Sequence, residues 1–186
     1  MRVQFARGPV RVAGVLGIVA AAFTVDQLTK AWALSYLGDG RIVELMLGAR
    51  LELAFNPGVA FGLGGTIGAP LVLALVAIAV ALAVWVIVRA VRGSGLAGTA
   101  FLAVAAGGAF GNIWDRTSRA NDGPLTGEVV DFIAVDWFAI FNVADIFTTC
   151  GIAGWALMSV LSSRRVGMDA NASAAVTVSA SDTDIR

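Results

Sequence analysis

The chain has 186 residues with 13 basic and 13 acidic side chains, and hydrophobic residues make up 58% of it. Its mean hydropathy of +0.83 lies outside the range of ordinary soluble domains and within that of integral membrane proteins. The formal net charge of zero offers no basic surface for nucleic acid. The absence of histidine excludes Ser-His-Asp and Cys-His nucleophiles, histidine zinc sites and histidine proton relays. Hydrolysis would therefore have to use carboxylates, or a serine activated by a lysine.

The first predicted element is a membrane-spanning helix over residues 12–34, preceded by three arginines. At 1.5 Å per residue, an apolar run of this length can cross about 30 Å of hydrocarbon. We expect an uncleaved anchor rather than a secretory signal peptide, because the helical pattern continues past the alanines at 20–22 without a polar cleavage region.

The next segment, residues 35–69, is broken by glycines and by Pro57, and it contains two short predicted strands at 41–46 and 51–55. These strands predict a small sheet on the membrane surface. Three further spans are predicted at residues 70–88, 96–114 and 138–161. The predicted fold is an all-α integral membrane domain over residues 1–166, with four transmembrane helices and a small extracytoplasmic β-sheet between spans 1 and 2. Residues 167–186 are predicted to form a disordered cytoplasmic tail.

The distribution of arginines predicts the orientation of these spans. Four spans place both termini on one side of the membrane, together with the short loop near residues 89–95. That side holds seven arginines: Arg2, Arg7, Arg11, Arg89, Arg92, Arg164 and Arg165. The opposite loops hold four: Arg41, Arg50, Arg116 and Arg119. Because basic residues favour the cytoplasmic side, both termini are expected there.

Polar side chains recur within and at the ends of the spans. Asp26 lies roughly 12 Å inside the first span, and Lys30 follows one turn later on the same face. Ionisable groups at that depth are expensive, so Asp26 is interpreted either as half of a structural ion pair or as a group that supports a site. Asn112 and Arg116 stand four residues apart as the third span ends. Arg116 there could bind a carboxylate through two parallel hydrogen bonds.

Two acidic motifs, Val129–Phe132 and Phe141–Asp145, hold the residues that could carry chemistry. Two carboxyl groups brought together in a poorly solvated site share one proton, so the pair can act as acid and base at once. In one uninterrupted helix Asp131 and Asp145 would lie about 20 Å apart along the axis, so a pair requires a bend within residues 132–140. Alternatively, Asp131 is an ordinary loop residue and Asp145 a helix-start residue favoured by the macrodipole.

Taken together, these motifs resemble those of the lipoprotein signal peptidases, the type II signal peptidases of bacteria. The resemblance covers about residues 12–162 and rests on five motifs that occur in order. They are Asp26-Gln27 with Lys30, Asn56–Gly58 with Ala60-Phe61, Gly111-Asn112 with Asp115-Arg116, Val129–Phe132, and Phe141–Asp145. The segment 117–127 is longer than the corresponding link of the family, and the tail beyond Gly167 has no counterpart.

The resemblance implies a catalytic pair and a set of supporting polar residues. The pair is Asp131 and Asp145, and the supporting residues are Asp26, Asn56, Asn112, Arg116 and Asn142. The implied reaction removes the signal peptide from a diacylglyceryl-modified prolipoprotein, just before the lipidated cysteine. The Asn56 loop and the small sheet would clamp the extended peptide. No metal or organic cofactor is implied.

The same resemblance implies the surroundings of the enzyme. Its partners would be prolipoprotein substrates and membrane lipids, with no nucleic acid, and a monomer is expected. The protein would cross the bacterial cell membrane several times, with its active site at the outer face.

Three other readings remain open from the residues alone. Acids within spans also suit an ion- or proton-coupled transporter, although inverted repeats and broken helices are not evident. A Ser/Lys peptidase would have to use Lys30, the only lysine, whereas Ser35 is five residues away. In a membrane scaffold, the polar motifs would only join helices.

Overall fold

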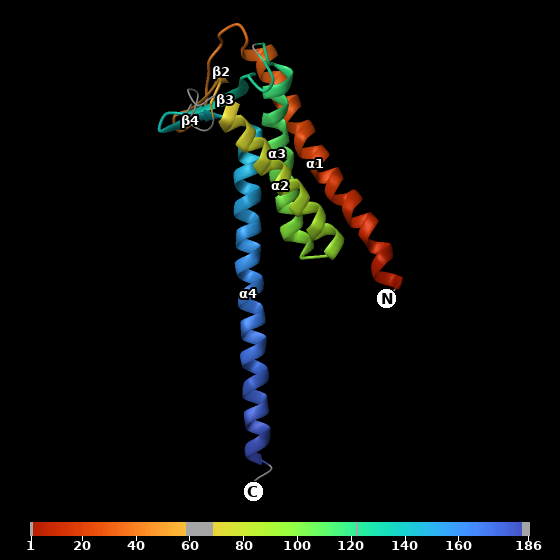
Figure 1. The fold of residues 1–186 in the computed structure, drawn as a ribbon. Coiled ribbons are helices and arrows are strands. Elements are labelled where there is room, and N and C mark those ends of the chain that lie inside the picture. Colours follow the sequence, from red (N-terminus) through yellow and green to blue (C-terminus); the bar gives the residue numbers. More distant parts are fainter. Residues whose placement is uncertain (1, 59–68, 122, 184–186) are drawn as a thin grey trace.

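The computed structural model describes residues 2–58, 69–121 and 123–183, which form four helices and one small sheet (Figure 1). The helices are α1 (Arg2–Leu37), α2 (Ala69–Arg92), α3 (Leu96–Ser118) and α4 (Val143–Thr183). Each contains an apolar segment long enough to cross a membrane, at Gly8–Leu37, Pro70–Arg92, Leu96–Ser118 and Val143–Arg164. The first turn of α1, the last turn of α4 and the α2–α3 turn lie away from the sheet, on the opposite side of the bundle (Figure 1). The four predicted spans are therefore confirmed.

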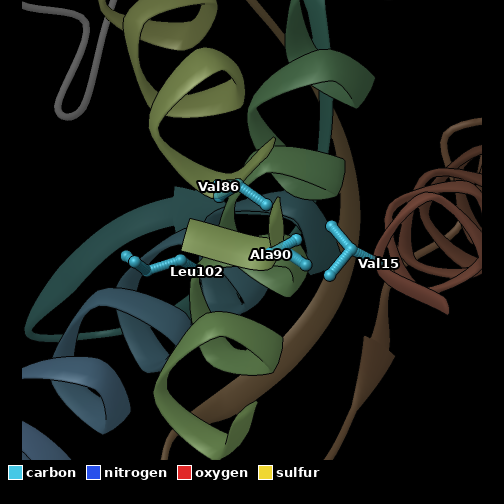
Figure 2. Packing of buried hydrophobic residues seen from close by; sticks show 5 residues of the cluster. Val15, Val86, Ala90 and Leu102 are labelled. Carbon is cyan, nitrogen blue, oxygen red and sulfur yellow. The ribbon is translucent and has the colours of Figure 1, made fainter. Parts of the chain in front are cut away.

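The central helix of the bundle is α3. Half of its apolar segment is buried by protein, against 11% for that of α1 and of α4. Small residues allow this close packing, because an added Cβ at Gly107 would lie 2.6 Å from the Cβ of Ala22 on α1. Nearer the chain ends, apolar side chains from three helices form one cluster (Figure 2). Its labelled members are Val15 of α1, Val86 and Ala90 of α2, and Leu102 of α3.

The sheet is antiparallel, with the order β1-β2-β3-β4. Its strands are β1 (Val43–Glu44), β2 (Ala49–Asn56), β3 (Val129–Val135) and β4 (Phe138–Phe141). The two strands predicted between the first and second spans are confirmed. The other two strands come from the α3–α4 connection, so the sheet joins two segments that are far apart in the sequence.

The start of the fourth span was predicted wrongly. Residues 138–141 form β4, and α4 begins only at Val143. A short apolar run does not distinguish a buried strand from a helix by its periodicity, and this run is rich in aromatic residues that favour strands. The β3–β4 hairpin supplies the bend that was predicted between Asp131 and Asp145.

At the other end, α4 continues as helix to Thr183, through most of the segment for which the sequence predicted a disordered tail. The segment contains no proline and many alanines, a composition compatible with a helix.

Candidate active site

Asp145 lies in the first turn of α4, where it is held by the residue that caps the helix. The side-chain Oδ1 of Asn142 accepts a hydrogen bond from the backbone N–H of Asp145 at 3.1 Å. In return, Oδ2 of Asp145 accepts one from the backbone N–H of Asn142 at 3.2 Å. These reciprocal bonds form a capping box, in which residues three apart satisfy each other's free N–H groups. The Asp145 carboxyl group is thereby fixed relative to the helix axis.

Asp131 lies on β3 with only 2% of its surface exposed. Its two carboxyl oxygens accept hydrogen bonds from two amides, from Asn142 Nδ2 at 2.6 Å and from Asn56 Nδ2 at 3.0 Å. Burial raises the pKa of Asp131 to about 6, and the nearby Asp145 carboxylate also raises it. The two amide donors act in the opposite direction because they favour the ionised form. Asp131 is therefore a carboxyl group that holds a proton more readily than an exposed aspartate.

Asn142 connects the two carboxyl groups directly. Its side-chain amide donates to Asp131, and its backbone N–H donates to Asp145. The same side-chain amide also donates to Oδ1 of Asn112 at 3.1 Å, and Asn112 Nδ2 donates to Asp145 Oδ1 at 2.8 Å. Asp131 and Asp145 thus belong to one hydrogen-bonded cluster formed by β3, α3 and the start of α4.

The orientation of the Asn112 side chain is fixed from behind by Lys30. The ammonium of Lys30 donates to Asn112 Oδ1 at 2.8 Å, so the NH₂ group of Asn112 must point toward Asp145. Lys30 also forms ion pairs of 2.9 Å with Asp26 and with Asp115. Each of the three charged side chains has 0% of its residue surface exposed. The buried ammonium of Lys30 provides both carboxylates with a counter-charge and hydrogen bonds, which compensates all three groups for their loss of contact with solvent.

Asp26 and Asp115 extend this cluster to neighbouring elements. Asp26 Oδ1 accepts a hydrogen bond from the backbone N–H of Ala144, in the first turn of α4, at 3.0 Å. Asp115 Oδ2 accepts one from the backbone N–H of Val130, the residue before Asp131, at 3.2 Å. The two partners of Lys30 therefore each hold the backbone beside one of the two active-site carboxyl groups.

Arg116 holds the loop that follows Asn56. Its guanidinium donates to the carbonyl oxygens of Pro57 and Gly58, and only 5% of the residue is exposed. The sequence suggested that Arg116 would bind a carboxylate, but these two bonds go to backbone carbonyls. Asn56 completes the turn, because its Oδ1 accepts the backbone N–H of Gly58 at 2.9 Å while its Nδ2 donates to Asp131.

A pocket of about 590 Å³ opens beside Asp131 on one face of the sheet. Its walls come from the end of β2 and from the β3–β4 hairpin. The lining residues are Ala54, Phe55, Asn56, Pro57, Asp131, Asp136, Trp137, Phe138, Ala139 and Ile140. The pocket is mainly apolar, with the Asp131 carboxyl group and the Asn56 amide as polar groups near the cluster.

All seven residues singled out from the sequence lie in or beside this cluster. Sequence reasoning gave less weight to Lys30 and Asp115, although they complete the network. The available signal was the depth of Lys30 in an apolar span, since a buried ammonium has three N–H donors and Asp26 alone does not satisfy them. Residues 59–61, part of the Asn56 motif, lie outside the described residues.

The fold and the site together define a class: a multi-pass membrane protein with a pair of carboxyl groups where the helices meet a small sheet. Two solved structures of bacterial membrane enzymes share this fold, both with a TM-score of 0.61. They are 23% and 25% identical to the chain, which covers 88% and 93% of them, and they align with 81% and 80% of the chain.

The sequence profile of the signal peptidase (SPase) II family, Peptidase_A8, matches residues 18–161. The lipoprotein signal peptidase of Bifidobacterium adolescentis is 45% identical over 138 residues, which are 74% of this chain and 71% of that protein. That of Rhodococcus jostii is 40% identical over 138 residues, 74% of this chain and 66% of that protein. The chain belongs to the signal peptidase II family of aspartic peptidases.

Proposed function

We propose that this protein removes the signal peptide from diacylglyceryl-modified prolipoproteins, cleaving before the lipidated cysteine, with Asp131 and Asp145 as its catalytic pair. Membership of the family supports the reaction. The observation that supports the pair is the bonding of Asn142 to both carboxyl groups, because it brings acids from two different elements, β3 and α4, into one site.

The mechanism follows from the different surroundings of the two acids. Asp131, with its raised pKa, carries the shared proton, and Asp145 acts as the base. Asp145 takes a proton from a water molecule as that water attacks the scissile carbonyl carbon, and Asp131 donates its proton to the carbonyl oxygen. Collapse of the tetrahedral intermediate breaks the C–N bond: Asp145 passes the proton it took from water to the leaving amine nitrogen, and Asp131 takes a proton back from one hydroxyl group of the intermediate as the new carboxyl group forms. The pair then returns to its starting state with one proton.

The other polar residues support this pair. Asn112 and Asn142 hold the carboxyl groups in place, and Arg116 with Asn56 shapes the loop beside the pocket. The extended substrate peptide lies along this pocket, between the sheet and the Asn56 loop. Asp26 acts through Lys30 and the α4 backbone rather than on substrate.

The proposal is tested with Asp131→Asn and Asp145→Asn, purified in detergent and assayed on a diacylglyceryl-modified precursor peptide. Each variant should lose at least about 1,000-fold in kcat, because a neutral amide can neither donate nor take the proton. Asp39→Asn is the matched control, since Asp39 is exposed and pairs only with Arg41 among the ion pairs of the described residues. Normal cleavage by either active-site variant would contradict the assignment of that residue.

The proposed orientation places both termini in the cytoplasm and the sheet at the outer face of a bacterial cell membrane. It is supported by the seven arginines at the terminal side against four at the other. In a Cys150→Ala background, a cysteine replacing Asp39 should react with an impermeant maleimide in intact cells, whereas one replacing Ser94 should react only after lysis. The reverse pattern would overturn the orientation.

A transporter is not favoured by the site. The ionisable groups of the cluster are joined by ion pairs at one end of the bundle, and the described residues contain no broken helix near the middle of a span.

A further inference from the structure

Two turns of the sheet expose large apolar side chains at the end away from α4. Met46 and Leu47, in the β1–β2 turn, are 82% and 94% exposed, and Trp137, in the β3–β4 turn, is 81% exposed. Leu45 and Phe138 beside them are about half exposed, at 50% and 47%. Residues 45–48 and 136–138 are called the hairpin tip below.

The hairpin tip is one structure, because its two turns are bonded to each other. The backbone N–H of Asp136 donates to the carbonyl oxygen of Gly48 at 3.1 Å. Arg50 at the start of β2 forms an ion pair of 2.6 Å with the Asp136 carboxylate. Strand pairing of Ala49 with Val135 holds the two turns side by side. The exposed apolar side chains therefore occupy fixed positions next to each other.

The backbone conformation at Leu47 is unfavourable for leucine, so the needs of the fold do not explain why a leucine occurs there. Leu47 has φ +61° and Gly48 has φ +73°, in a tight turn closed by the Ala49 N–H on the Met46 carbonyl at 3.2 Å. Asn or Gly is favoured at such a position, and a leucine there costs roughly 1–2 kcal/mol. With 94% of its surface exposed, Leu47 regains nothing by packing within the chain. Contact with an apolar phase outside the chain would offset this cost.

The position of the tip relative to the spans identifies that phase. Asn142 alone separates β4 from α4, whose membrane-spanning segment begins at Val143. Trp137 is therefore within roughly 20 Å of the start of that segment, at about 3.4 Å per strand residue. The sheet extends to one side of the helices, beside the first turns of α4, rather than along their axis (Figure 1). The tip thus overhangs the lipid that surrounds the bundle, at the level of the headgroups.

We propose that the hairpin tip inserts Met46, Leu47 and Trp137 into the boundary between the headgroups and acyl chains of the adjacent leaflet. Tryptophan is enriched at that boundary, where its ring is apolar and its N–H can reach polar groups. The Arg50–Asp136 ion pair behind these side chains stays among the headgroups. Insertion stops at this depth, because strand edges carry free backbone groups that hydrocarbon cannot satisfy.

Insertion of the hairpin tip also sets the position of the pocket mouth relative to the membrane surface. Trp137 and Phe138 belong to the hairpin tip and line the pocket beside Asp131. The membrane surface therefore meets the pocket at its rim. This inference rests on the membrane spans and not on the proposed chemistry, so it stands or fails independently of the peptidase assay.

The test measures the depth of nitroxide labels on the full chain in phosphatidylcholine nanodiscs. In a Cys150→Ala background, single cysteines replace Leu47, Trp137 and, as the control, exposed Asp39. The measured quantity is the ratio of the label's collision rate with oxygen to its collision rate with a water-soluble nickel complex. We expect this ratio to be several-fold higher for the labels at 47 and 137 than for the label at 39. A ratio at 47 and 137 equal to that at 39 overturns the proposal, because the tip would then lie in water.

A different occupant gives a different signature. If a second copy of the chain or another protein covers the tip, the labels become immobile and are shielded from both reagents, which also overturns the proposal. A second measurement uses no label and compares tryptophan fluorescence of the unmodified protein with that of Trp137→Phe. The Trp137 component should be quenched more by lipids brominated near the headgroup than by lipids brominated near the chain end. Absence of quenching by both lipids contradicts insertion.

Discussion

Asn142 and Asp145 bond to each other twice, side chain to backbone in both directions, so the start of α4 and the position of one carboxyl group of the proposed catalytic pair are set by the same two residues. Asn142 additionally donates to Asp131. A single side chain thus has a structural role as a helix cap and a positioning role toward both acids, and the two roles can be separated.

Substituting Asn142 separates capping from bridging. Asn142→Ala should lower stability by about 1 kcal/mol through loss of the cap, with a further loss from the bond to Asp131. Asn142→Ser should keep most of the cap, because a serine hydroxyl can accept the Asp145 N–H, but it is too short to replace the amide on Asp131. We expect the Tm in detergent to order as Asn, then Ser, then Ala. Both variants should lose at least about tenfold in kcat. Wild-type kcat in Asn142→Ser would contradict the bridging role.

The pH dependence of cleavage should report the proton on Asp131. The pKa of Asp131 is raised to about 6, so the proton needed by the mechanism is present below that pH and is lost above it. We predict an alkaline limb of kcat/KM with an apparent pKa near that value. Asn56→Ala removes an amide that lowers the Asp131 pKa, so the limb should move to higher pH, by about 1 unit. A limb that stays in place or moves to lower pH would exclude Asp131 as the proton donor.

Lys30 should be indispensable for stability, although its partners among the described residues are Asn112, Asp26 and Asp115 rather than the proposed catalytic pair. Lys30→Met leaves Asp26 and Asp115 buried without their shared cation, which costs about 3–5 kcal/mol. We expect a large fall in Tm and in the yield of folded protein. Adding Asp26→Asn to Lys30→Met should restore part of the Tm. Arg92→Met, at an exposed position on α2, serves as the control and should change little.

The close approach of α1 and α3 should depend on the lack of a side chain at Gly107. An added Cβ there would lie 2.6 Å from the Ala22 Cβ and 2.7 Å from the Val19 carbonyl oxygen, so Gly107→Ala must push the helices apart. The expected cost is about 1–3 kcal/mol, seen as a lower Tm. Gly17→Ala is the matched change on α1, where nothing lies within 4 Å of the new Cβ. A larger loss in Gly17→Ala than in Gly107→Ala would contradict this packing.

Hydropathy was sufficient to predict the four spans, because a membrane helix must be long and apolar throughout. It was insufficient for residues 138–141, where a short apolar run was assigned to the helix that follows. Only the pairing of β4 with β3, a contact between strands, distinguishes the two structures. Strands β1 and β2 were easier to predict, because glycines and Pro57 separate them from the spans in the sequence.

The site was predictable as a set of residues but not as a set of bonds. Helical spacing placed Asn112 and Arg116 at one end of α3, and the bend between the acids was required by geometry. The partners of each side chain depend on how three helices and a sheet approach one another. Hence Arg116 was expected to bind a carboxylate, but it donates to two backbone carbonyl groups. Lys30 was expected to pair with Asp26 alone, but it also binds Asp115 and Asn112.

The bond from the Ala144 N–H to Asp26 joins residues 118 positions apart, and it connects the first membrane helix to the last. During synthesis on the ribosome, the first helix enters the membrane long before Asp145 exists. Asp26 can pair with Lys30 within the first helix, but its hydrogen bond from the Ala144 N–H can form only when the final helix has been made. With Asp145 in the proposed catalytic pair, a nascent chain would gain activity only once its last membrane helix is in place.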